Sequence, residues 1–460
     1  MVRHARHLQR ELTPRKIQMI ALGGAIGVGL FMGSASTIDW TGPSVLIDYA
    51  IAGLVMYLIM RALGEMLYIK PVTGSFADFA TKYMHPVFGY LSAWSNIFEW
   101  VMVGMSEVVA MGVYCSFWWP NLPKWIPSLI AIVFLESINL VSVRSFGTLE
   151  YWFSFIKVFT IILMIIAGFG VILFGFGNGM HPTGISNLWT HGFFAGGVKG
   201  FFFAFAIVLA SYQGIVEFMG TTAGEAKNPK RSIIKATQST IYRILIFYIG
   251  SIFVIISIYP WNELKTIGSP FVEIFVKLGI TVAAGIINFV VLTAAFSGCN
   301  SGIYNISRMA YALAKKHELP KSFAKLNRRG VPYIAVLAVA IGLLLGVVLS
   351  IVLPMVLNDG SKVFVMIYSS SVLPGMVPWF VILVSQLKFR KQESPAIIQK
   401  HPFKMPFSPT SNYFVFIMLG LTVIFMALNP DTQIPLLLGV VFLIIMTIIY
   451  YAKYNKQVTK

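Results

Sequence analysis

The stretch Ile20-Ala-Leu-Gly-Gly-Ala-Ile-Gly-Val-Gly-Leu-Phe31 lies in the first apolar run of the chain. Its four glycines are Gly23, Gly24, Gly27 and Gly29, and each interior glycine weakens a helix by about 1 kcal/mol relative to alanine. The bland explanation is close packing of membrane helices through small residues. The alternative is an unwound segment, which is tolerated at membrane depth only where it lines a cavity or is buried in protein. We expect an interrupted helix that holds a ligand.

The composition places this stretch in a membrane. Of the 460 residues, 57% are hydrophobic and 11% are charged, whereas soluble domains carry about 25% charged residues. This small number of charged residues cannot cover a surface that faces water. The outer surface of the protein must therefore face lipid. The formal net charge is +18, but no solvated basic domain concentrates it as a nucleic-acid binder would. We expect no nucleic-acid partner.

Apolar runs of about 20 residues are long enough to cross a bilayer as helices. None of them alternates as the strands of a membrane barrel do. The prediction is an all-α, polytopic membrane protein with twelve transmembrane helices. The expected spans are 17–38, 43–67, 88–118, 126–143, 150–175, 197–221, 233–259, 279–306, 332–353, 362–386, 411–428 and 433–452.

The positive charges predict the orientation, because cytoplasmic loops of membrane proteins are rich in Lys and Arg. Twelve spans put both termini on one side, and most Lys and Arg residues outside the spans fall on that side. The tails 1–16 and 453–460 are therefore predicted to be cytoplasmic. No apolar segment with a small-residue cleavage site follows the basic N-terminus, so we expect no removable signal peptide. The few positive residues on the other side are Lys124, Lys199, Lys265, Lys277 and Lys362.

A second interruption falls in the sixth span, where Ala210-Ser-Tyr-Gln-Gly-Ile-Val-Glu217 places Gly214 beside polar side chains and an acid. It is either a polar kink packed on its neighbours or a true break. Spans 1 and 6 hold corresponding places in two five-helix halves, and such paired interruptions point to a transporter's binding site. Half-helix N-termini attract a carboxylate, and free carbonyls attract an ammonium. The pair predicts a site for a zwitterion.

Five motifs carry a resemblance to a known family, and they are spread over nearly the whole chain. They are Gly23–Phe31, Gly64–Leu67, Pro71–Phe76, Ala223–Pro229 and Ser297–Gly302. In these motifs the chain resembles the bacterial amino acid transporter family of the amino acid–polyamine–organocation superfamily. It is most similar to the threonine/serine, proline and histidine permeases of that family. The resemblance implies a multi-pass protein of the bacterial cytoplasmic membrane.

The resemblance also implies the leucine-transporter fold. In that fold 17–175 and 197–386 are inverted repeats, and 411–452 forms two peripheral helices. The family's backbone ligands for the substrate carboxylate and amine match positions in the two interruptions. One departure is visible, because Ile215 and Val216 separate Gly214 from Glu217 where the family usually has one residue. The matched positions are Ala25, Gly27, Val28, Gly29, Ala210 and Ser211.

Lys157, Glu107 and Glu217 are the candidate coupling residues among the ionisable residues inside predicted spans, where charge is costly and functional by default. Lys157 in span 5 either snorkels to the interface or acts as a titrating cation beside the span 1 interruption. The resemblance favours the second role, because proton-coupled members of the family carry a lysine there. Glu107 in span 3 is either a hydrogen-bonded structural carboxyl or a coupling residue. Glu217 in span 6 is expected to take part in coupling too.

Other polar residues are assigned to selectivity or to structure. Arg61 and Glu65 are spaced to form an i,i+4 pair on span 2. Glu225 opens the basic stretch after span 6 and is assigned to a cytoplasmic gate. We expect selectivity to come from Ser106, Tyr212 and Gln213. No charged residue awaits a charged substrate side chain. Together with the resemblance to the threonine/serine, proline and histidine permeases, this favours a neutral or weakly polar amino acid, with threonine, serine, proline and histidine as the leading candidates.

The resulting hypothesis is a secondary transporter that imports an amino acid by proton symport with alternating access. An amino acid exchanger, or a channel or sensor on the same fold, is the alternative. An enzyme is not expected, because no His/Asp cluster or Gly-x-Ser-x-Gly nucleophile is present. Cys115 and Cys299 form no metal-ligand pattern, so neither a metal nor a cofactor is expected.

Overall fold

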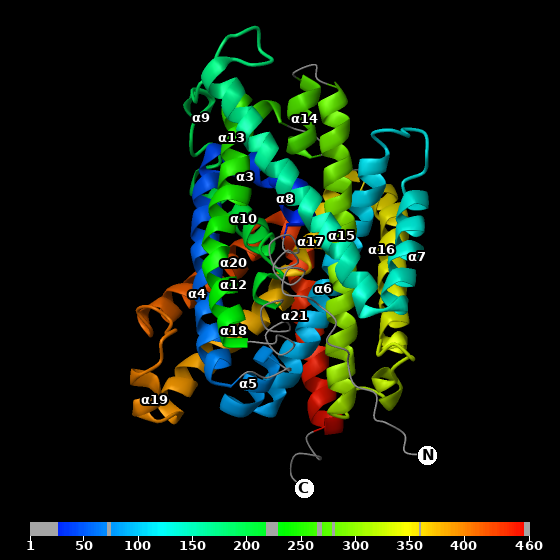
Figure 1. The fold of residues 1–460 in the computed structure, drawn as a ribbon, viewed down its shortest axis with the longest axis vertical. Coiled ribbons are helices and arrows are strands. Elements are labelled where there is room, and N and C mark those ends of the chain that lie inside the picture. The colour runs from blue at the N-terminus through cyan, green and yellow to red at the C-terminus, as the bar shows by residue number, and fades with distance from the viewer. Residues whose placement is uncertain are drawn as a thin grey trace.

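The computed structural model describes residues 26–70, 75–217, 229–264, 269–277, 281–357 and 360–454. Within these ranges the chain folds into helices, turns and loops, and no strand occurs. Most of the helices are long and stand side by side in one bundle, with α5 and α19 at one end and α9 and α14 at the other (Figure 1). The predicted all-α membrane fold is confirmed.

The helices follow the order of the predicted spans. In the first half they are α2 (Val28–Phe31), α3 (Gly33–Thr41), α4 (Val45–Ile69), α5 (Ser75–Tyr83), α6 (Pro86–Cys115), α7 (Trp125–Val141), α8 (Val143–Phe174), α9 (Asn187–Thr190) and α10 (Gly197–Ala210). After residue 228 they are α12 (Pro229–Arg243), α13 (Ser251–Ile258), α14 (Pro270–Lys277), α15 (Thr281–Lys315), α16 (Tyr333–Leu357), α17 (Gly360–Ser369), α18 (Val372–Gln392), α19 (Pro395–Gln399), α20 (Thr410–Leu428) and α21 (Pro430–Ile449).

Ten helical runs among the described residues are long and apolar enough to cross a membrane. One of them, Val28–Ile69, has 42 residues, and a helix of that length would be about 63 Å long. This is twice the hydrocarbon core of about 30 Å, so the run holds two crossings. They are divided at Gly42, whose φ of +69° ends α3. With the 17-residue helix α7, all twelve predicted spans have a counterpart.

The centre of the bundle is formed by α6 and α15, which pack along each other. In the apolar window of α6, 72% of the residues are buried inside the protein, against 39% in α20 and 22% in α21. Helices α20 and α21 leave most of their surface for lipid, as do α8 and α16, with 39% and 28% of their windows buried, so the peripheral position of 411–452 stays a prediction. The inverted-repeat relationship between 17–175 and 197–386 stays a prediction.

Several boundaries differ from those predicted. Helix α8 begins at Val143 rather than at residue 150, because Ser142 caps it by accepting a hydrogen bond from the Ser145 amide at 3.0 Å. Span 7 contains a π-helical segment, Ile244–Gly250, between α12 and α13. Span 10 is divided into α17 and α18 by a turn at Ser370 and Ser371.

Candidate functional site

The described part of span 1 begins with non-helical backbone. Ile26 and Gly27 are outside any helix, and the first helical residue is Val28. The Val28 amide donates to Glu107 Oε1 of α6 at 3.3 Å. A Cβ on Gly27 would lie 2.6 Å from that oxygen, so any larger residue here would force the Glu107 carboxyl to shift. The amide at the start of α2, where the substrate carboxylate is expected, is therefore occupied by a side chain of the protein.

Span 6 is interrupted as predicted. Helix α10 ends at Ala210, residues 211–214 form turns, and Gly214 has a φ of +91°, a conformation that glycine adopts at little cost. Helical backbone returns at residue 215. Glu217 spans the break, because its Oε2 accepts from the Gly214 amide at 2.8 Å. Its Oε1 accepts from the Trp379 indole of α18 at 2.9 Å.

The break in span 10 lies against the break in span 6. The Gln213 amide group donates to the Ser371 carbonyl at 3.2 Å and accepts from the Ser371 hydroxyl at 3.0 Å. A Cβ on Gly375 would lie 2.6 Å from Gln213 Nε2 and 3.0 Å from Glu99 Oε1. The predicted selectivity residue Gln213 therefore joins two interrupted helices beside the buried carboxyl of Glu99.

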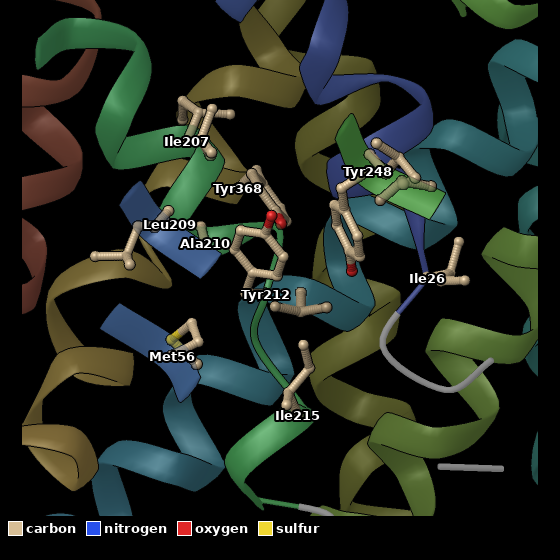
Figure 2. Close-up of a cluster of buried hydrophobic side chains, with 14 of the residues drawn as sticks. Ile26, Met56, Ile207, Leu209, Ala210, Tyr212, Ile215, Tyr248 and Tyr368 are labelled. Carbon is tan, nitrogen blue, oxygen red and sulfur yellow. The ribbon is translucent and has the colours of Figure 1, made fainter. Parts of the chain in front are cut away.

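Three tyrosines gather between the start of the described part of span 1 and the break in span 6 (Figure 2). The Tyr248 hydroxyl donates to the Ser211 carbonyl at 3.1 Å, and the Tyr212 hydroxyl donates to the Tyr49 carbonyl at 2.9 Å. The Tyr368 hydroxyl lies against Gly29, where a Cβ would also be 3.0 Å from Ser211 Cα. This close approach makes the space beside the Gly29 backbone narrow.

The remaining predicted substrate residues are occupied by local bonds. The Ala210 carbonyl accepts from the Gln213 amide at 3.0 Å within the turn. The Ser106 hydroxyl donates to the Val103 carbonyl of its own helix at 2.7 Å and is fully buried. Ala25 and Glu225 lie outside the described residues.

From α8, Lys157 reaches the non-helical backbone with which the described part of span 1 begins. Its side chain is fully buried, and its Nζ donates to the Ile26 carbonyl at 2.9 Å and to the Ser297 hydroxyl of α15 at 2.8 Å. A snorkelling lysine would place its ammonium at the membrane surface, so the structure contradicts that alternative. Lys157, the only Lys or Arg in the predicted span 5, therefore donates a hydrogen bond to the non-helical backbone at Ile26.

Glu150 is the residue that the sequence analysis missed. Its side chain, on α8 seven residues before Lys157, is fully buried. The carboxyl accepts hydrogen bonds from the Ser297 hydroxyl and from Asn300 Nδ2, the latter at 3.1 Å. The sequence placed Glu150 at the membrane edge, because span 5 was predicted to begin there. The spacing of seven residues between Glu150 and Lys157 was the available signal, since it puts both side chains on one helix face.

The expected i,i+4 pair between Arg61 and Glu65 is wrong. Glu65 forms a two-pronged ion pair with Arg390 of α18, with Arg390 Nε 2.7 Å from Glu65 Oε1 and Nη2 2.9 Å from Oε2. Arg61 instead donates to the Lys404 carbonyl and covers the Phe403 ring. The planar guanidinium matches both carboxylate oxygens at once, which the i,i+4 geometry does not offer.

A second ion cluster ties α5 to the end of α18. The Glu393 carboxylate accepts from Lys70 at 3.1 Å, Lys82 at 3.3 Å and the Tyr83 hydroxyl at 2.9 Å. Burial alone would raise the pKa of Glu393, but these three hydrogen bonds outweigh it and hold the pKa below its usual value. Within the described residues, no cluster of His, Cys, Asp and Glu is suited to a metal ion.

Comparison with known proteins agrees with this arrangement. The sequence profile of a family described as "Amino acid permease" matches residues 16–460. The chain belongs to the amino acid permease family. It is 58% identical over 447 residues to the probable threonine/serine transporter YbxG of Bacillus subtilis, covering 97% of this chain and 95% of that protein.

Two further relatives show how broad the family is. The chain is 40% identical to the amino-acid permease AapA of Bacillus subtilis, covering 96% of this chain and 94% of the relative. It is also 40% identical to the aromatic amino acid transport protein AroP of Shigella flexneri, covering 98% and 96%. Family membership therefore makes the chain a multi-pass amino acid permease and not an enzyme.

Proposed function

We propose that this permease imports a small neutral or weakly polar amino acid together with a proton. Threonine and serine are the foremost candidates, since the relative that is 58% identical is named a probable threonine/serine transporter. The observation that carries the proposal is the bond from the Lys157 ammonium to the Ile26 carbonyl. It joins a group that can gain or lose a proton to the unwound backbone where the substrate is expected.

The substrate carboxylate is proposed to bind the amides of Val28 and Gly29. Glu107 holds the Val28 amide in this structure, so an incoming carboxylate must displace it. Two carboxylates at one amide repel each other, which links substrate entry to the state of Glu107. The substrate amine is proposed to bind the carbonyls at Ala25, Ala210 and Ser211, after Tyr248 releases the Ser211 carbonyl.

Lys157 is proposed to couple the proton to the substrate. While protonated, it makes a charge-assisted bond to the Ile26 carbonyl, and such bonds are about twice as strong as neutral ones. Loss of the proton weakens that bond and frees the backbone next to Gly27 and Val28. Glu217 is proposed to transmit the change to span 10 through its bonds to Gly214 and Trp379.

The narrow space beside Gly29 supports a small substrate side chain. The Tyr368 hydroxyl and Ser211 Cα both lie within contact of where a Gly29 Cβ would be. An aromatic substrate side chain would have to displace Tyr368, whereas a hydroxymethyl group needs far less room. We also propose that both termini face the cytoplasm, as the Lys and Arg distribution predicts.

Uptake of labelled threonine into proteoliposomes, with and without an inward proton gradient, tests the proposal. We expect accumulation above the outside concentration only with the gradient, and competition by unlabelled serine. Downhill equilibration that ignores the gradient would indicate a channel. Uptake that requires internal amino acid would indicate an exchanger. An absence of threonine uptake alongside uptake of a phenylalanine probe would refute the assigned substrate class.

A further inference from the structure

Ser297 of α15 lies between Lys157 and Glu150. Its hydroxyl oxygen accepts from Lys157 Nζ at 2.8 Å, and the hydroxyl hydrogen is directed to Glu150 Oε1. A serine hydroxyl has one hydrogen to donate, so both bonds point in one direction, from the lysine to the carboxylate. This is the arrangement that proton transfer along a hydrogen-bonded chain requires.

The Glu150 carboxylate is contacted by side chains of α15 and of its own helix α8, and α7 supports one of these contacts. Asn300 of α15 donates to its Oε2 at 3.1 Å, and Ser154 of α8 lies 3.5 Å from its Oε1. Asn300 is itself fixed by Asn139 of α7, whose Nδ2 donates to Asn300 Oδ1 at 2.8 Å. A buried carboxylate in a membrane protein is costly, and hydrogen bonds to Ser297 and Asn300 stabilise this one.

The position of Glu150 along α8 gives the chain a direction. It lies seven residues before Lys157, or about 10 Å along the helix axis. The first residue of α8, Val143, lies seven residues before Glu150, at the end of the helix that is predicted to face the cytoplasm. Glu150 therefore stands midway between the lysine and the predicted cytoplasmic surface.

We propose that Glu150 is a second proton-carrying residue, which receives the proton of Lys157 through Ser297 and releases it toward the cytoplasm. This inference rests on the proposed proton symport. In the transfer, the Lys157 ammonium gives a proton to Ser297 Oγ while the Ser297 hydrogen moves to Glu150 Oε1. The products are a neutral amine, an intact hydroxyl and a carboxylic acid. Release of the proton to water on the inner side restores the carboxylate.

Other ionisable groups near this chain do not extend it. Glu107 of α6 lies within electrostatic range of both Lys157 and Glu150, but its Oε1 bonds the Val28 amide. Glu136 of α7 is buried, and its oxygens make no hydrogen bond within the described ranges. The Cys299 thiol on α15 lies within electrostatic range of Glu107 and Glu136. Glu136 therefore serves as the matched control for a buried carboxylate of the same region.

The test uses the full-length protein in liposomes that contain a trapped pH-sensitive dye. Two quantities are measured for each variant: threonine-driven proton influx, and exchange of labelled for unlabelled threonine at equal pH. For Glu150→Gln we expect exchange within about twofold of the unmodified protein but no proton influx. Accumulation under a one-unit pH gradient should fall from about tenfold to about onefold. Glu136→Gln should keep both activities.

The bridging hydroxyl is tested independently by Ser297→Ala, which should reproduce the loss of proton influx, and by Ser297→Thr, which should restore it. This pair decides the matter if Glu150→Gln fails to reach the membrane. Proton influx and tenfold accumulation in Glu150→Gln would overturn the inference while leaving proton symport intact. Equal loss of exchange and influx would also overturn it, since that indicates a structural role. If the unmodified protein shows no proton influx, the proposed function itself fails.

Discussion

Replacement of Lys157 by methionine is the perturbation that most directly tests proton coupling. Methionine has a similar length but no charge, so it fills most of the buried space without replacing the ammonium. The Ile26 carbonyl and the Ser297 hydroxyl each lose the donor that now lies 2.9 Å and 2.8 Å away. We expect substrate binding to weaken modestly and gradient-driven accumulation to disappear.

The magnitude follows from the proposed coupling, in which Lys157 carries one proton per substrate molecule. A pH difference of one unit supplies about 1.4 kcal/mol, which allows about tenfold accumulation at equilibrium. Without Lys157 the ratio should be about one. Each buried partner left unsatisfied costs about 1–3 kcal/mol, so the thermal midpoint of Lys157→Met should also fall.

The assay is uptake of labelled threonine into liposomes whose membrane potential is clamped at zero, so that only the pH difference drives accumulation. Thermal unfolding of the purified protein shows whether the variant is folded. Lys199→Met is the control, because Lys199 is an exposed lysine near the start of α10 and its loss should leave accumulation near tenfold. Tenfold accumulation by folded Lys157→Met would refute the coupling role.

Lys157→Arg separates charge from proton exchange. An arginine keeps a positive charge near the Ile26 carbonyl, but a guanidinium is not deprotonated in proteins. We expect this variant to retain exchange of threonine at equal pH better than Lys157→Met does, while still failing to accumulate threonine. Accumulation by Lys157→Arg would show that a fixed charge is sufficient and that the lysine proton is not the transported one.

Three further predictions concern the site and its supports. Gly29→Val should reduce threonine uptake at least tenfold, and undiminished uptake would count against the site. When the same substitution is made in Tyr368→Ala protein, the clash with the Tyr368 hydroxyl is removed, so the thermal midpoint of that protein should change little. Arg390→Ala leaves the buried Glu65 carboxylate without its ion partner and should lower the free energy of unfolding by about 3 kcal/mol. Thermal unfolding measures the change, and an unchanged midpoint would contradict this prediction. Because the folded-state pKa of Glu393 is lowered, its contribution to stability is present above its usual pKa of 4.5 and is lost as the pH falls through the folded value. Glu393→Gln should therefore flatten the loss of thermal stability below about pH 4.5, and an identical acid profile would be inconsistent with the cluster.

Features with a local cause were predictable from the sequence. The twelve spans follow from apolar runs, and each run crosses the membrane because its length matches the hydrocarbon core. The interruption in span 6 follows from Gly214, whose positive φ is open to glycine and costly for other residues. Lys157 was identified because a lone cation in an apolar helix must find a partner, and here it finds the Ile26 carbonyl.

Features with a long-range cause were missed. The turn that divides α17 from α18 contains no glycine, and it is held by Gln213, more than 150 residues away in the chain. The Arg61–Glu65 pair was predicted from spacing alone, but the carboxylate binds Arg390, which reaches both of its oxygens. No single-helix pattern reveals such a choice, because an i,i+4 pair contributes only about 0.5 kcal/mol.

Glu150 lies between these two cases. Its spacing from Lys157 is visible in the sequence, and so is the spacing of three residues between Ser297 and Asn300, which puts that pair on one face of span 8. What the sequence does not show is that these two polar faces meet. Each face alone is explained by small-residue packing or by a charge at the membrane edge, whereas together they form the hydrogen bonds that join Lys157, Ser297, Glu150 and Asn300. In a bilayer that mutual satisfaction is required, so a polar face on one predicted span should be matched against those on the others before it is assigned to packing.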